Sequence, residues 1–170
     1  MTSPPKQQEV QLKNDDETVA QLATPSAFVH AVSVAARAFG HHRDPRRELY
    51  LTHALDVAQA VGADATESEL STAVLHDVLE DTDWTTDDLA DSGVEATILD
   101  AVETLTRRPE EEDEAFVARI CATPGVIGLT AQRVKLADLN VNLATADSPE
   151  QRERFERSIP IVRNALERNR

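Results

Sequence analysis

The sequence contains few of the residues that form disulfides, tight turns and aromatic cores. Among its 170 residues there are one Cys and five Gly, and aromatic residues make up only 4%. A single cysteine, Cys121, excludes an internal disulfide and is compatible with a reducing compartment. Hydrophobic residues still make up 41% of the chain, so a core built mainly of Leu, Val, Ala and Ile is expected. The scarcity of Gly and of alternating β-branched residues favours helices.

Positive charge and long apolar runs are also scarce. The chain has 17 Lys and Arg against 31 Asp and Glu, which gives a formal net charge of −14. This balance argues against nucleic acid as a partner, because binding to phosphate backbones requires a basic surface. No apolar run approaches the roughly 18 residues of a membrane span, and no signal-peptide pattern is present, so a cytoplasmic location is expected. An anionic substrate must therefore be attracted locally, by a metal or by a few Arg and Lys side chains.

Apolar spacing divides the chain into a polar N-terminal part and a helical remainder. Residues 1–23 are predicted to be a flexible polar tail, and residues 24–170 are long enough for one domain with one core. Apolar residues at spacings of three and four predict helices, with Gly and Pro at their ends. The predicted helices cover residues 25–39, 51–61, 67–82, 86–93, 94–106, 110–122, 126–146 and 149 to the C-terminus. No strand is predicted, so the expected fold class is all-α.

The segment from Leu75 to Thr82 concentrates titratable residues on the predicted helix 67–82. It contains His76, Asp77, Glu80 and Asp81, and on a helix their offsets place all four side chains on neighbouring parts of one surface. Three carboxylates crowded beside an imidazole repel one another, and a bound cation would relieve that cost. The alternative is an ordinary acidic helix end that Asp81 caps. The four residues together favour a metal or catalytic site.

Two further helices carry candidate metal ligands. His53 lies in the first turn of its predicted helix, where a hydrogen-bonded core histidine is the alternative. Asp138, Asn142 and Thr145 have offsets of four and seven, so they form one polar stripe on a helix that is otherwise largely apolar. That stripe either faces partners inside the protein or faces solvent. A mixed nitrogen and oxygen donor set suits Mn, Fe or Zn better than Ca or Mg. The candidate donors are His53, His76, Asp77 and Asp138.

The order of these residues, a His, then His-Asp, then Asp, resembles the HD superfamily of metal-dependent phosphohydrolases. Several local segments are similar to the hydrolase domain of RelA/SpoT proteins. They are Tyr50 with His53, residues 75–82, residues 85–89, residues 102–106, and residues 134–138 with Asn142. The resemblance covers roughly residues 31–145. Because the chain ends soon after the last segment, it resembles the stand-alone small alarmone hydrolases rather than the long bifunctional members.

The resemblance implies a single-domain HD-type helical bundle that holds one Mn2+. The implied activity is hydrolysis of the 3′-diphosphate of ppGpp and pppGpp, which yields GDP or GTP and pyrophosphate. Carried over by position, the implied metal ligands are His53, His76, Asp77 and Asp138. The implied catalytic pair is Glu80 and Asp81. The implied substrate contacts are Arg43, Asn142 and Thr145, and His42 and Lys135 are predicted beside them.

Few cations are available to neutralise a polyphosphate. Arg43 matches a basic residue of the family's first loop, whereas His42 stands where the family usually has Arg. Lys135, Arg107 and Arg108 are further candidates for phosphate contacts. For Lys135 the alternative is a helix residue whose charge reaches solvent. For the two Arg residues the alternative is a cap on the helix that precedes them.

Departures from the family pattern keep other functions open. Besides His42, Leu139 stands where the family usually has Arg, and the family's usual His before Asn142 is absent. One alternative is an HD phosphohydrolase acting on another nucleotide, for example on the 2′-phosphate of NADPH. Another is a non-catalytic nucleotide-binding module, against which the Glu80–Asp81 pair argues. The sequence does not distinguish a monomer from a homodimer.

Overall fold

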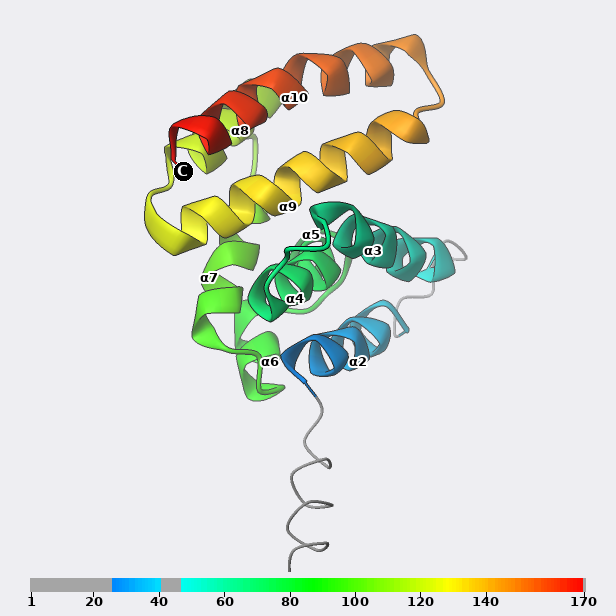
Figure 1. Ribbon diagram of the computed structural model, residues 1–170. Helices are drawn as coiled ribbons and strands as arrows, with labels where there is room; N and C mark the ends of the chain where they lie inside the picture. The colour runs from blue at the N-terminus through cyan, green and yellow to red at the C-terminus, as the bar shows by residue number, and fades with distance from the viewer. Residues whose placement is uncertain (1–25, 41–46, 170) are drawn as a thin grey trace, which may run out of the picture.

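The computed structural model describes residues 26–40 and 47–169, and every regular element within them is a helix (Figure 1). The predicted tail of residues 1–23 and the predicted substrate contacts His42 and Arg43 lie outside these residues. The all-α prediction is confirmed. The helices are α2 (Ala27–Gly40), α3 (Arg47–Val61), α4 (Glu67–Leu75), α5 (Val78–Asp81), α6 (Thr86–Asp91), α7 (Ala96–Leu105), α8 (Asp113–Ala122), α9 (Gly125–Ala144) and α10 (Pro149–Arg168).

Local sequence signals determine several of the helix boundaries. Gly62 follows α3 with a φ of 117°, and Gly93 follows α6 with a φ of 84°. Residues other than glycine rarely adopt these backbone angles. The hydroxyl of Thr85 accepts from the Asp88 N–H, and the Asp88 carboxylate accepts from the Thr85 N–H. This reciprocal capping begins α6 at the predicted place.

The prediction of one continuous helix over residues 67–82 is wrong. α4 ends at Leu75 and α5 begins at Val78, with Asp77 between them at φ −99° and ψ −1°. The ring Nδ1 of His76 donates to the carbonyl oxygen of Ala73 at 2.8 Å. In a continuous helix the N–H of Asp77 would donate to that carbonyl, so the imidazole competes with the backbone for it. The break therefore arises at the histidine that is the strongest candidate ligand.

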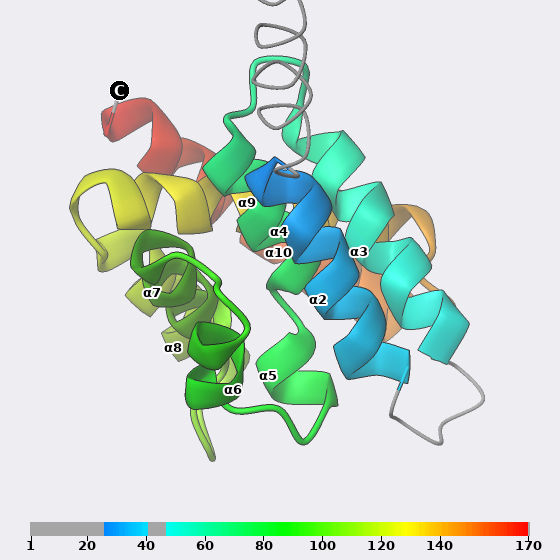
Figure 2. The same cartoon turned by 90° about the horizontal axis from the view of Figure 1, so that it is seen from below.

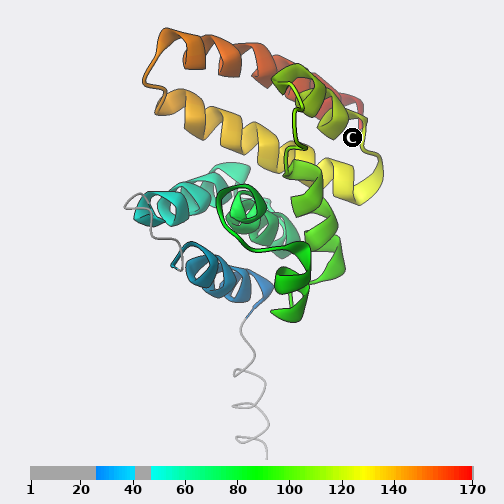
Figure 3. The same ribbon diagram turned by 180° about the vertical axis from the view of Figure 1, so that it is seen from behind.

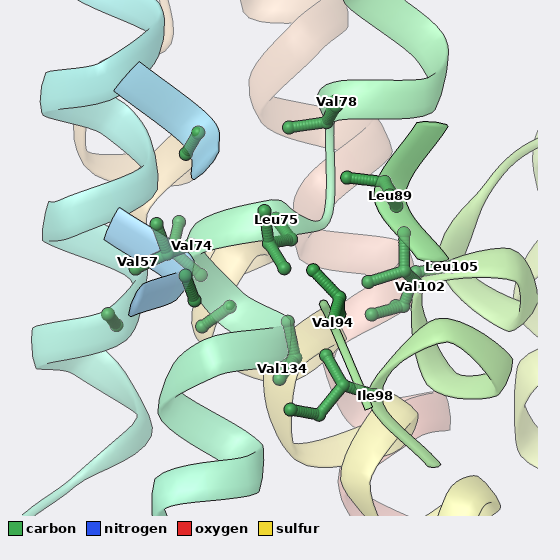
Figure 4. Close-up of a cluster of buried hydrophobic side chains, with 14 of the residues drawn as sticks. Val57, Val74, Leu75, Val78, Leu89, Val94, Ile98, Val102, Leu105 and Val134 are labelled. Carbon is green, nitrogen blue, oxygen red and sulfur yellow. The ribbon is translucent and has the colours of Figure 1, made fainter. Parts of the chain in front are cut away.

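Helix α9 lies at the centre of the molecule, with α10 on one side and α3, α4 and α7 on the other (Figures 1 and 3). Val134 and Ala137 of α9 join the main core, part of which is drawn in Figure 4. Leu139 joins a second cluster with Val117, Ile159 and Val162 of α8 and α10. Since successive helical residues are about 100° apart, Asp138 points to the seam between these two clusters.

Helix α2 covers the main core on the side away from α10. α2 packs against α3 and α4, which Figure 2 shows from below. The sequence predicts an apolar stripe on this helix that includes Val29, Ala35, Ala36 and Phe39, and the prediction is only partly right. Ala35 and Phe39 are buried, whereas Val29 and Ala36 are exposed and Val34 is buried instead. Within the described part of the chain, no helix has the length and apolar character that crossing a membrane requires.

Gly128, in the first turn of α9, is packed against the chain that precedes the helix. A Cβ at this position would lie 1.8 Å from the carbonyl oxygen of Thr123, a backbone atom that cannot move away cheaply. We expect Gly128→Ala to lower the free energy of unfolding by about 1–3 kcal/mol, measured by urea denaturation. Gly40→Ala is the matched control, because its Cβ would meet no atom of the described residues within 4 Å. Equal stability of the two variants would contradict this packing.

Candidate metal centre and its cavity

Three side chains from separate parts of the fold meet between α3, α4 and α9. His53 of α3, His76 after α4 and Asp138 of α9 each offer a ligand atom, and these atoms lie within 4.8 Å of one another. His76 and Asp138 are buried, and His53 is partly buried. A cluster of two imidazoles and a carboxylate has the donor types of a divalent transition-metal site.

Asp77 lies beside this cluster. Its Oδ1 is 3.1 Å from Nε2 of His76, and its Oδ2 is 3.7 Å from Nε2 of His53. Oδ1 of Asp138 is 3.3 Å from Nε2 of His53 and 3.7 Å from Nε2 of His76. The structure thus brings together the four residues that the sequence proposes as ligands: His53, His76, Asp77 and Asp138.

The buried Nε2 atom of His76 is the best indication of what the cluster binds. Nδ1 of this ring donates to a backbone carbonyl, so the neutral ring has a lone pair on Nε2. That atom is buried and has no hydrogen-bond partner in the described structure, although carboxylate oxygens face it. An unshared lone pair facing carboxylates is unfavourable unless a proton or a metal cation lies between them. Metal-ligating histidines typically donate their other ring N–H in this way, so the donor set fits a divalent cation.

The charges around His76 are consistent with this interpretation. Burial alone would lower the pKa of His76, but the carboxylates of Asp77 and Asp138 outweigh burial and raise it well above its usual value. The field at this ring therefore strongly favours a positive charge. In the metal-free protein a proton can supply that charge, and a divalent cation would compete with it.

Neighbouring residues on α9 hold Asp138 in place. Nζ of Lys135 donates to Oδ2 of Asp138 at 2.8 Å, and the amide of Asn142 donates to Oδ1. Although burial favours the neutral acid, Lys135 and the two histidines hold the pKa of Asp138 well below its usual range. Asp138 is thus an ionised, oriented carboxylate. Thr145 is exposed, and its hydroxyl donates to the carbonyl of Val141 in its own helix, so the structure does not bring it to the cluster.

The two predicted catalytic acids are placed differently. Asp81 is partly buried, and burial together with the charges of Asp77 and Glu80 raises its pKa to about 6. A carboxyl group with such a pKa can exchange a proton near neutral pH. Glu80 is exposed, and its Oε1 accepts from the backbone N–H of Arg107 at 2.6 Å. The turn between α7 and α8 therefore fixes the position of Glu80.

Arg119 of α8 organises that turn. Its guanidinium donates to the carbonyls of Thr104 and Thr106 and to both carboxylate oxygens of Glu111. The pair with Arg119 lowers the pKa of Glu111 to about 2. The acidic run of residues 110–114 is predicted from the sequence to form the solvated first turns of the helix 110–122, and this prediction is wrong for Glu111, which precedes α8 and is paired with Arg119. Eight residues of a helix span about 12 Å, which is too far for a direct ion pair, so helical periodicity could not reveal the pair of Glu111 and Arg119.

A cavity of about 340 Å3 opens beside the cluster. Lys135 and Asn142, both proposed as substrate contacts, line it, and so does Arg107. Arg108 does not line it and faces a different surface depression. Helices α8 and α10 contribute wall residues that the sequence analysis did not assign to the site: Asp113, Phe116, Val117, Gln151, Arg154, Phe155 and Ser158. Apolar and charged residues alternate along α8 and α10 as they do in any amphipathic helix, so the sequence pattern did not identify these wall residues.

No protein-family model and no curated protein matches the chain. A solved structure similar to it is that of a metazoan ortholog of SpoT that hydrolyzes ppGpp and plays a role in starvation responses. The two chains are 22% identical, and the match covers 86% of this chain and 88% of the other, with a TM-score of 0.66. At this identity the similarity establishes a shared fold. That fold is the all-α architecture that the sequence motifs predict.

Proposed function

We propose that the chain is a metal-dependent hydrolase that removes the 3′-diphosphate of ppGpp and pppGpp as pyrophosphate. The observation that carries this proposal is the buried Nε2 atom of His76, which has no hydrogen-bond partner among the described residues. It faces the carboxylates of Asp77 and Asp138, which line the cavity. Such a centre needs a cation, and the sequence segments around it resemble those of the alarmone hydrolases. The shared fold with a ppGpp-hydrolysing protein supports the same substrate.

In this proposal His53, His76, Asp77 and Asp138 hold one Mn2+ ion. The set is mixed in nitrogen and oxygen and contains no thiolate, which favours a metal of intermediate hardness. When bound, such a cation supplies Lewis-acid polarisation of a phosphoryl oxygen and makes water acidic enough to lose a proton near neutral pH. Lys135 and Asn142 support the centre by fixing the orientation of Asp138.

Glu80 and Asp81 handle protons in the proposed reaction. Glu80 is held by the N–H of Arg107, which directs one carboxylate oxygen and leaves the other available. Burial and the charges of Asp77 and Glu80 raise the pKa of Asp81 to about 6, so Asp81 can exchange a proton near neutral pH. Arg43 and His42 remain predicted phosphate contacts from the sequence.

The test is incubation of the protein and Mn2+ with ppGpp, pppGpp and NADPH, with chromatographic separation of the products. We expect GDP from ppGpp and GTP from pppGpp, each with one equivalent of pyrophosphate, and no reaction after chelation of the metal. Release of phosphate from NADPH alone would instead support a phosphohydrolase acting on another nucleotide. Binding of these nucleotides without turnover would identify a non-catalytic module.

A further inference from the structure

The cavity has a second charged centre apart from the metal cluster. Arg107 comes from the turn before α8, Asp113 from the first turn of α8 and Arg154 from α10, and all three line the same cavity as His53 and Asp138. Oδ1 of Asp113 is 2.7 Å from Nη2 of Arg107, and Oδ2 is 3.4 Å from Nη1 of Arg154. One carboxylate therefore bridges two guanidinium groups, and the trio has a surplus of one positive charge.

The guanidinium of Arg107 is held from several sides. Besides Asp113, its Nη1 donates to the carbonyl of Glu111 at 3.1 Å, and its Cζ lies 4.8 Å from the centre of the Phe116 ring. The Phe116 ring is buried, so it provides a rigid surface for this cation–π contact. Arg107 is thus preorganised, which reduces the entropy lost when it binds a ligand.

Arg154 is the more exposed partner. Its guanidinium lies 4.9 Å from the centre of the Phe155 ring, and 45% of its side chain is accessible. Lys135, the remaining cation that lines the cavity, is already paired with Asp138. In a chain with a net charge of −14, the positive charge on the cavity wall that is not paired with a proposed metal ligand therefore lies at the two arginines.

We propose that Arg107 and Arg154, bridged by Asp113, bind a second phosphate group of the substrate, remote from the phosphate that reacts at the metal cluster. The inference rests on the proposed function and assigns residues of the cavity wall to the 5′ phosphates of its substrate. Guanidinium groups are well suited to phosphate oxygens because they donate two parallel hydrogen bonds. A nucleotide without the 5′ phosphates makes no contact with these two guanidinium groups.

The experiment compares Arg154→Gln with the wild-type protein on two substrates, ppGpp and guanosine 3′-diphosphate with a free 5′-hydroxyl. We expect kcat/KM for ppGpp to fall by about tenfold to a hundredfold, mainly through KM, because one charge-assisted phosphate contact is lost. The kcat/KM for the substrate with a free 5′-hydroxyl should stay unchanged. Arg163→Gln, an exposed substitution on the same helix away from the cavity wall, should change neither value. An equal loss on both substrates, or no loss on ppGpp, overturns the inference while the hydrolase function stands.

Calorimetric titration with GDP tests the same contact without turnover. GDP has only the 5′-diphosphate, so Arg154→Gln should weaken its binding to the Mn2+-treated protein by a similar factor. If the wild-type protein hydrolyses neither substrate, the proposed function fails and this titration alone decides the inference. An unchanged GDP affinity in Arg154→Gln then rejects the second phosphate site.

Discussion

The Asp138→Asn variant should fail to retain a divalent cation and should lose hydrolase activity. Asp138 is buried, ionised and close to both histidines, so its charge is central to the affinity of the cluster for a cation. Changes to residues that only orient a metal ligand typically cost 10–100-fold in affinity, and loss of an anionic ligand should cost at least as much. The measurement is metal content after dialysis against Mn2+, together with isothermal titration.

Asn is a more informative replacement here than Ala. Lys135 donates to Oδ2 of Asp138 and has little solvent access, so removing its partner entirely would leave a buried charge unpaired. Breaking a buried ion pair in that way typically costs about 3–5 kcal/mol. The Asn side chain retains an oxygen that can accept from Lys135 and differs mainly in charge. Circular dichroism should therefore show a helical protein whose metal affinity is reduced.

Asp100→Asn provides the control for net charge. Asp100 is exposed on α7 and lies outside the cavity wall, so this variant loses the same charge away from the cluster. It should bind Mn2+ as the wild type does. Wild-type metal retention and activity in metal-stripped and reloaded Asp138→Asn protein would show that the cluster is not the metal centre.

Most of the fold could be predicted because its signals are local. Helix faces follow from apolar residues three and four apart, and the ends of α3 and α6 follow from Gly62 and Gly93, whose positive φ angles favour glycine. The break at His76 could not be predicted in this way. It depends on a hydrogen bond from a side chain to the backbone, and an uninterrupted apolar pattern conceals it.

The candidate site could be predicted only in part. Spacing alone could not show that His53, His76 and Asp138 converge, because the relative placement of three helices is not encoded in the period of any one of them. The resemblance to a family supplied that step, and the geometry is consistent with it. The wall formed by Asp113 and Arg154 was missed because it depends on α8 meeting α10 across the cavity.

The Glu80→Gln variant should lower kcat by about a hundredfold or more while KM and metal affinity stay near the wild-type values. The amide oxygen of Gln can still accept from the Arg107 N–H, so the turn between α7 and α8 should keep its conformation. What the variant loses is the ability to take up a proton. Kinetics at saturating Mn2+, combined with a metal titration, separate these effects. Asp83→Asn is the control, since Asp83 is an exposed acid on the loop after α5.

Glu80→Ala distinguishes proton transfer from a purely structural role of Glu80. Ala removes both the carboxylate and the acceptor for the Arg107 N–H, so the turn that holds Arg107 against Asp113 loses one of its contacts. We therefore expect Glu80→Ala to show the same loss of kcat as Glu80→Gln and, in addition, a higher KM for ppGpp. If Glu80→Gln instead turns over normally and Glu80→Ala raises only KM, Glu80 supports the turn and takes no part in proton transfer. Asp81, with its pKa of about 6, would then be the residue that exchanges the proton.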